Sequence, residues 1–127
     1  MSIGYEVQKK PGFIFVISRR EFTNEVMEEF FEEVPKLAYE SGVSKILVDC
    51  RAISKLVDVD ERFNYAVNIA KCFNGLEVAA VADIPLRDPE LFGEKVAQKL
   101  GANFHMCSNM KEACAWLDIG QDQISSS

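Results

Sequence analysis

The sequence predicts a single α/β domain in which four helices flank a five-stranded, mostly parallel sheet that begins with an antiparallel hairpin. Two apolar runs, Lys45–Cys50 and Glu77–Asp83, have the length of buried strands and carry an aspartate at their ends. A stretch of helically spaced apolar residues follows each run. Near the N-terminus, the turn signal Pro11-Gly12 separates two further strand patterns. Because strands and helices alternate after this hairpin, the sheet is expected to be mainly parallel.

Length and composition favour one globular domain without a membrane span. At 127 residues, we expect a domain over residues 1–119 and a flexible polar tail over residues 120–127. No apolar stretch approaches the roughly 20 residues that cross a bilayer. The segment Met1–Glu6 lacks signal-peptide character, so we expect a cytoplasmic protein. The formal net charge of −6, from 14 basic and 20 acidic residues, disfavours nucleic acid and anionic membranes as partners.

The N-terminal part is expected to form an edge strand, a central strand and one long helix. The strands are Tyr5–Lys9, which alternates weakly, and Phe13–Ser18, the most apolar run of the chain. The helix, Thr23–Ser41, has an apolar stripe on one side and an acidic face on the other. The apolar stripe consists of Val26, Met27, Phe30, Phe31, Val34, Leu37 and Ala38. Pro35 lacks an N–H group and is expected to kink this helix, and Gly42 is expected to end it.

Capping signals mark the starts of the three later helices. Asp58 and Glu61 have the spacing of a capping box, and Asn109 and Glu112 repeat it. Asp88-Pro89 combines an N-cap residue with a proline at the first helical position. The helix that begins at Asp58 has one apolar face, formed by Val59, Phe63, Ala66, Val67, Ala70 and Phe73.

The same patterns predict the last strand and the core. The strand, Asn103–Cys107, is expected between a helix that ends at Gly101 and a final helix that stops by Gly120. The residues expected to be buried are Phe15, Ile17, Phe30, Val34, Leu47, Phe63, Val81, Val96 and Leu117. The cysteines match no zinc-binding pattern, so we expect buried thiols at Cys50, Cys72, Cys107 and Cys114.

The loop Arg51–Val57 is the first place to look for function, because open α/β sheets collect their sites at the carboxyl ends of strands. Three apolar residues stand among its polar ones, namely Ile53, Leu56 and Val57. If these are partly exposed, Leu56 is the expected anchor for a partner, with Arg51 and Lys55 as a polar rim. The alternative is that they pack beneath the loop and that Arg51 pairs with Asp49.

No combination of residues predicts catalysis, a metal site or a cofactor. Cys50 lies beside Arg51, which could lower the thiol pKa, but a Cys/His nucleophile would need the fold to bring it to His105. Asp49 and Asp83 end two strands, where paired carboxylates can bind a metal or act as acid and base. The more ordinary interpretation is that they bind loop amides or cap the next helix. We therefore predict a non-enzymatic protein with no catalytic residues, no metal ligands and no cofactor.

An ordered set of stretches resembles the SpoIIAA-like, or STAS-like, domain family. These are Ile46–Asp49 before a loop, Glu61–Phe63 at the start of the second helix, Val78–Asp83, and Glu112–Leu117 near the end. The resemblance covers about residues 3–118 and implies a bacterial βα superhelical domain that works by binding a protein partner. Together with the loop argument, it points to a partner-binding site formed by Arg51, Ile53, Ser54, Lys55, Leu56 and Asp58.

The best-known members of that family are anti-anti-sigma factors, switched by phosphorylation of a serine at the start of the second helix. This sequence has Asp58-Val59-Asp60-Glu61 there, so we expect no such switch. Ser54 lies earlier, where a helix N-terminus would favour an added phosphate but the aspartates would oppose it. A related layout in Sec14-type domains supplies the alternative, a small carrier of a lipid or other apolar ligand. A second copy of the chain, forming a homodimer, is a further candidate partner.

Overall fold

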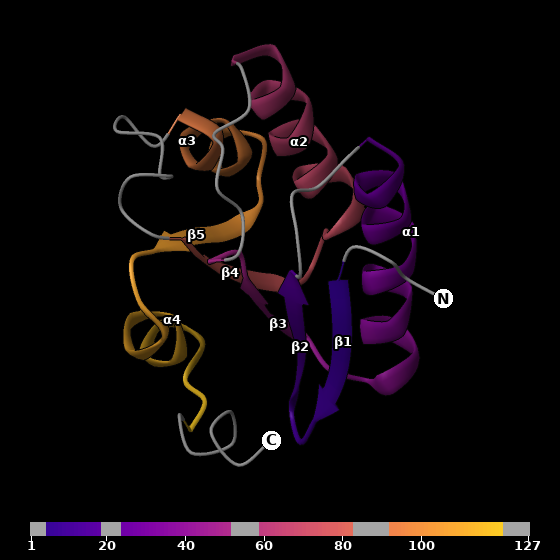
Figure 1. Cartoon of the computed structure of the whole chain (residues 1–127), viewed down its shortest axis with the longest axis vertical. Coiled ribbons are helices and arrows are strands. Elements are labelled where there is room, and N and C mark those ends of the chain that lie inside the picture. The colour runs from indigo at the N-terminus through magenta and orange to yellow at the C-terminus, as the bar shows by residue number, and fades with distance from the viewer. Residues whose placement is uncertain (1–4, 19–23, 52–58, 83–91, 121–127) are drawn as a thin grey trace.

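The computed structural model describes residues 5–18, 24–51, 59–82 and 92–120 (Figure 1). In chain order the elements are β1 (Tyr5–Lys10), β2 (Phe13–Ser18), α1 (Asn24–Ser41), β3 (Lys45–Asp49), α2 (Val59–Cys72), β4 (Glu77–Val81), α3 (Phe92–Lys99), β5 (Asn103–Cys107) and α4 (Met110–Leu117). This is the predicted order of a hairpin, a long helix and three strand–helix units. None of the described helices has the length and apolar character that a membrane crossing requires.

The strands cross the sheet in the order β1-β2-β3-β4-β5, so each strand pairs with its neighbour in sequence. β1 is antiparallel to β2, and the later pairings are all parallel, which confirms the predicted sheet. In the register, Leu47 of β3 lies between Phe15 of β2 and Ala79 of β4. Because β2 to β5 run in the same direction, their carboxyl ends lie along the same end of the sheet. Asp49 ends β3 there, and Cys107 ends β5.

Helices α1, α2 and α3 cover one face of the sheet, and α4 covers the other (Figure 1). Successive strand residues point to opposite faces, so Ile46 and Val48 enter the core beneath α1–α3, whereas Leu47 enters the core beneath α4. The first core is the larger and includes an aromatic group in which Phe30 contacts Tyr5 and Phe73. The core beneath α4 consists of Phe13, Phe15, Leu47, Ala79, Val81, Cys107, Ala113, Cys114 and Leu117.

Most of the predicted core is confirmed, and one residue is a clear error. Of the residues predicted to be buried, those that the structure buries are Phe15, Phe30, Val34, Leu47, Val81 and Leu117. Ile17 and Val96 are half-buried, and Phe63 is 47% exposed, so its predicted burial was wrong. The ring contacts of Phe31 with Tyr65 and with Phe73 decide which side of α2 faces inward. Phe63 precedes Tyr65 by two residues, more than half a helical turn, and therefore points away from that side.

The helix ends follow local signals, and the end of α4 adds a left-handed residue that is not a glycine. Gly42 and Gly101 both have positive φ, at 71° and 99°, and end α1 and α3 as predicted. Helix α4 stops before Gly120, as predicted, and its left-handed C-cap residue is Asp118 (φ 58°). The N–H of Asp118 donates to the carbonyl of Ala115 at 3.2 Å, which satisfies one of the last helical acceptors. An aspartate can do this because its short polar side chain tolerates the left-handed conformation better than most residues.

The helix starts agree with the capping signals wherever these fall within the described residues. Asn109 has extended backbone (φ −154°), and its side chain accepts a hydrogen bond from the Glu112 N–H at 2.8 Å, which confirms the predicted cap. The caps predicted at Thr23, Asp58 and Asp88 lie outside the described residues. Helix α1 continues through Pro35 as one element, with the proline buried.

Candidate functional site

The carboxyl end of β3, the predicted site, is organised by an ion pair between neighbouring residues. Asp49 Oδ1 accepts hydrogen bonds from the Arg51 backbone N–H at 3.0 Å and from Arg51 Nε at 2.9 Å. Asp49 Oδ2 accepts a third from Arg51 Nη2 at 2.8 Å. The Ser18 hydroxyl of β2 donates to the Asp49 carbonyl at 2.7 Å and ties this corner to the adjacent strand. The intramolecular Arg51–Asp49 pair weighed in the sequence analysis is therefore present.

The ion pair with Arg51 keeps the Asp49 carboxyl ionised. Burial by itself would raise the pKa of this carboxyl. The side-chain and backbone hydrogen bonds from Arg51, together with its positive charge, outweigh burial and lower the Asp49 pKa below its usual value of 3.8. Asp49 is thus an ionised structural group with its oxygens occupied by Arg51. Asp83, its predicted companion, lies outside the described residues.

Cys50 lacks the properties of a nucleophile. Burial and the nearby Asp49 carboxylate raise the pKa of its thiol to about 12, so the expected lowering by Arg51 was wrong. Cys50 packs against the core beneath α1–α3, whereas His105 pairs with Glu112 of α4 on the other face of the sheet. The suggested Cys50/His105 pair therefore does not form. All the cysteines are free thiols, and only Cys107 and Cys114 are fully buried as predicted.

Much of the predicted partner-binding loop lies outside the described residues, including Ile53, Ser54, Lys55, Leu56 and Asp58. The structure does describe the elements that follow and precede that loop. Arg51 remains about half exposed while it is held by Asp49. Phe63, in the first half of α2, presents a large apolar side chain to solvent. Large aromatic side chains are among the residues that most often anchor protein partners.

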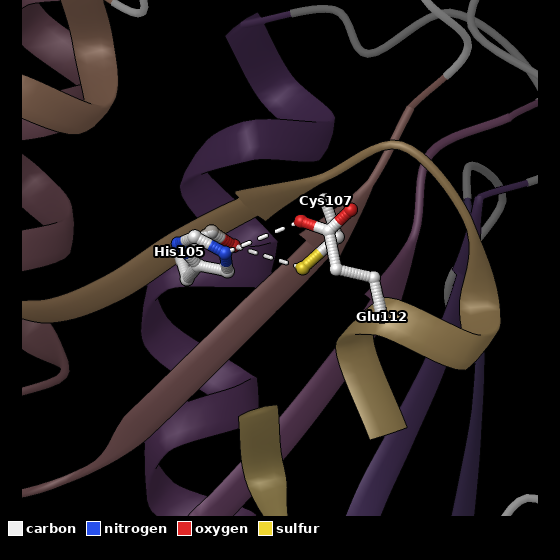
Figure 2. A group of neighbouring side chains, drawn as sticks. All are labelled: His105, Cys107 and Glu112. Carbon is white, nitrogen blue, oxygen red and sulfur yellow. Dashed lines mark hydrogen bonds and ion pairs between the residues drawn. The ribbon is translucent and has the colours of Figure 1, made fainter. Parts of the chain in front are cut away.

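A second group of polar side chains gathers where β5 meets α4 (Figure 2). His105 and Cys107 are two residues apart on β5 and therefore project from the same face of the strand. Glu112, in the first turn of α4, lies opposite them, and one potential ligand atom from each residue falls within 4.8 Å of the others. His105 Nε2 is 3.3 Å from Glu112 Oε2. Cys107 Sγ is 4.0 Å from the His105 carbonyl oxygen.

Neighbouring groups hold two of these side chains in place. The Ser108 hydroxyl donates to Glu112 Oε1 at 3.1 Å, so the glutamate reaches back past the Asn109 cap to the preceding residue. Partial burial would raise the pKa of Glu112, but the hydrogen bonds from Ser108 and the pairing with His105 outweigh it and lower the pKa. The His105 ring stacks on the Trp116 ring, with centroids 5.3 Å apart and planes inclined by 20°.

No common role was predicted for these three residues. Glu112 was expected to cap the last helix, and His105 was considered as a possible partner of Cys50. The sequence pattern that could have predicted this cluster is His-x-Cys on a strand, followed by a glutamate in the first turn of the next helix. Alternation along the strand places the first two side chains together, and a tight strand-to-helix connection returns the third to them.

Two solved structures are similar to the chain over nearly its whole length. The crystal structure of an anti-sigma factor antagonist from Mycobacterium paratuberculosis matches with a TM-score of 0.61 and 15% identity, over 90% of this chain and 92% of that one. The chain has the STAS-like fold. A variant of Moorella thermoacetica RsbS, with a serine replaced by glutamate, matches with a TM-score of 0.60 and 14% identity, over 90% of this chain and 94% of that one.

These likenesses establish the STAS-like fold. At the level of sequence, no family model and no curated protein matches the chain. Neither matched structure is described as a lipid carrier, so the Sec14-type alternative finds no support. The coverage of 90% shows that the STAS-like fold accounts for almost the entire chain.

Proposed function

We propose that this protein is a non-enzymatic regulatory module of the bacterial cytoplasm that acts by binding a protein of the anti-sigma factor class. The observation that carries the proposal is the shared fold, over 90% of the chain, with an anti-sigma factor antagonist. The partner class follows from that protein's own description and is transferred here as part of the proposal. The acidic net charge of −6 agrees with a protein partner rather than a nucleic acid.

The binding surface in this proposal is the corner formed by the loop after β3 and the outer side of α2. Phe63 supplies an exposed aromatic ring on α2, and large aromatic side chains contribute strongly to protein–protein interfaces. Arg51 supplies a charged group whose position is already fixed by Asp49, so little side-chain entropy would be lost on binding. Leu56 remains the predicted apolar anchor from the loop itself.

We further propose that no phosphoserine at the start of α2 switches this module. The residues from Asp58 to Phe63 contain no serine or threonine but do contain Asp58, Asp60 and Glu61. The sequence thus has acidic residue types at the start of α2, where a helix dipole favours negative charge. Phosphopeptide mapping of protein isolated from its host should find no phosphate in this region. Stoichiometric phosphate on Ser54 would contradict the wider claim that phosphorylation does not control the module.

Photo-crosslinking gives the sharpest test of the surface. A photoreactive phenylalanine analogue is placed at Phe63, and as a matched control at Tyr39, which is 57% exposed on α1. Each version is mixed with purified anti-sigma factors encoded by the host. An adduct from position 63, and none from position 39, is the expected result. Equal adducts from both positions, or none from either, would count against this surface.

Affinity measurements complete the test. Titration calorimetry should show that Phe63→Asp weakens binding of the crosslinked partner at least about tenfold, since a hot-spot residue contributes about 2 kcal/mol or more and about 1.4 kcal/mol is tenfold. Leu100→Asp is the control, because Leu100 is equally exposed but follows α3. Unchanged affinity for Phe63→Asp would place the interface elsewhere, and the acidic outer face of α1 would be examined next.

A further inference from the structure

We propose that His105, Cys107 and Glu112 bind one Zn²⁺ ion at the junction of β5 and α4, each residue supplying one ligand (Figure 2). This site is separate from the partner-binding corner, because it lies on the face of the sheet covered by α4 and at the far edge strand. The inference does not depend on the proposed function.

The donor set suits zinc. Imidazole nitrogen, thiolate sulfur and carboxylate oxygen are the three ligand types that Zn²⁺ accepts in proteins. In a tetrahedral site with bonds of about 2.0–2.3 Å, ligand atoms are separated by roughly 3.3–3.6 Å. The His105 Nε2 to Glu112 Oε2 distance of 3.3 Å already has this value. The other separations are at most 4.8 Å, so side-chain movements of about 1 Å would complete the geometry.

The surroundings of the three residues resemble the outer shell of a metal site. Ser108 occupies Glu112 Oε1, which directs Oε2 toward His105. Trp116 stacks on the imidazole and restricts its rotation. Hydrogen-bonded and packed neighbours of this kind orient ligands and raise metal affinity. His105 and Glu112 are partly exposed and open to an ion from solvent, whereas Cys107 is buried behind them, so the thiol would be the inner ligand and the side chains in front of it would have to move for the ion to bind.

Three ligands leave the fourth tetrahedral position open to water or to a donor from another molecule. The ion would also join the edge strand β5 to α4, because two ligands come from the strand and one from the helix. Zinc should therefore stabilise the folded chain, with a gain that rises with the logarithm of the free zinc concentration above the dissociation constant, as for any ligand specific for the native state. Binding should strengthen as pH rises, because the imidazole and the thiol must give up their protons to coordinate.

Cobalt is the first probe, because Co²⁺ replaces Zn²⁺ and is visible spectroscopically. The full chain, stripped with a chelator, is titrated with Co²⁺ while absorption and tryptophan fluorescence are recorded. We expect saturation at one ion per chain, a thiolate-to-cobalt charge-transfer band, and quenching of Trp116, the single tryptophan of the sequence. Added Zn²⁺ should reverse both signals. Saturation without a thiolate band, or no binding at all, would overturn the proposal.

Variants then assign the ligands. Cys107→Ser should abolish the charge-transfer band, and Glu112→Gln should weaken Zn²⁺ binding at least about tenfold. Glu112 is partly exposed, so the Gln variant should remain folded even if Cys107→Ser, at a buried position, does not. Cys114→Ser is the matched control, since this buried thiol belongs to the same core but not to the cluster. Equal Zn²⁺ affinity for wild type and the folded Glu112→Gln variant would show adventitious binding and overturn the assignment.

Discussion

The guanidinium of Arg51 binds both carboxylate oxygens of Asp49, at 2.9 and 2.8 Å, at the end of the central strand β3. Because the folded-state pKa of Asp49 is lowered, the pair stabilises the fold above the unfolded pKa of 3.8, and this contribution is lost as the pH falls through the lower, folded value. At pH 7, Arg51→Ala should reduce the free energy of unfolding by about 1 kcal/mol, because Arg51 is half exposed and solvent screens the pair. Urea denaturation of the wild type and of Arg51→Ala measures this difference in the free energy of unfolding.

The pH dependence separates this pair from a packing effect. The difference between wild type and Arg51→Ala should shrink as the pH falls below the ordinary aspartate pKa of 3.8 and through the lower, folded value, where Asp49 becomes protonated in the wild type as well. Lys36→Ala, which removes an exposed charge on α1, is the control and should show a much smaller effect at pH 7. A difference that stays constant down to the lowest pH would mean that Arg51 acts through its aliphatic packing.

Two leucines at opposite extremes of burial test the position of the core. Leu47 is fully buried between β2 and β4, whereas Leu100 is 54% exposed just after α3. Leu47→Ala should lower the free energy of unfolding by about 2–5 kcal/mol, because truncation leaves a cavity in a packed region. Leu100→Ala should change it by no more than about 0.5 kcal/mol. Similar losses for both variants in chemical denaturation would contradict this placement of the core.

The start of α4 depends on a single side-chain cap. Asn109 accepts the Glu112 N–H at 2.8 Å, so Asn109→Ala should cost about 1 kcal/mol of stability. Asn109→Ser restores an acceptor of suitable length and should recover most of that loss. Thermal unfolding of the three proteins side by side makes the comparison. Failure of serine to rescue the alanine variant would show that the amide does more than cap the helix.

At the other end of α4, a non-glycine residue occupies left-handed backbone. Asp118 has φ 58°, where glycine is free of the steric penalty imposed by a side chain. Asp118→Gly should therefore stabilise the protein by roughly 0.5–1 kcal/mol, after the added flexibility of the unfolded glycine chain is subtracted. Asp118→Ala retains a Cβ atom and should give no such gain. Calorimetry that ranks alanine above glycine would refute this explanation.

The features predicted correctly from the sequence are those governed by short-range interactions. Gly42 and Gly101 end helices because a few consecutive residues determine the left-handed turn. Asp49 and Arg51 are two residues apart, so their pairing could be foreseen. The sheet followed from apolar runs of strand length separated by helical patterns, which admit few arrangements.

The misplaced residues are those whose surroundings come from distant parts of the chain. Phe63 fits a helical apolar stripe, but the contact of Tyr65 with Phe31 of α1 turns the opposite side of α2 inward. Glu112 satisfies a local capping rule, and that local role concealed its position opposite His105. Sequence spacing specifies which residues share a side of an element, whereas the packing of elements decides which side is covered.

The sequential strand order has a consequence for how the chain is synthesised. Each strand of the β1-β2-β3-β4-β5 sheet pairs with the one made just before it, so no strand has to enter between two that are already joined. On the ribosome, the N-terminal hairpin can form first and offer the free edge of β2 to β3, and each later strand then extends the newest edge. After the hairpin, each loop closure spans one helix and its connections, which keeps the entropic cost of pairing small. The sheet can thus be completed in the order in which its residues emerge, with β5 and α4 joining last.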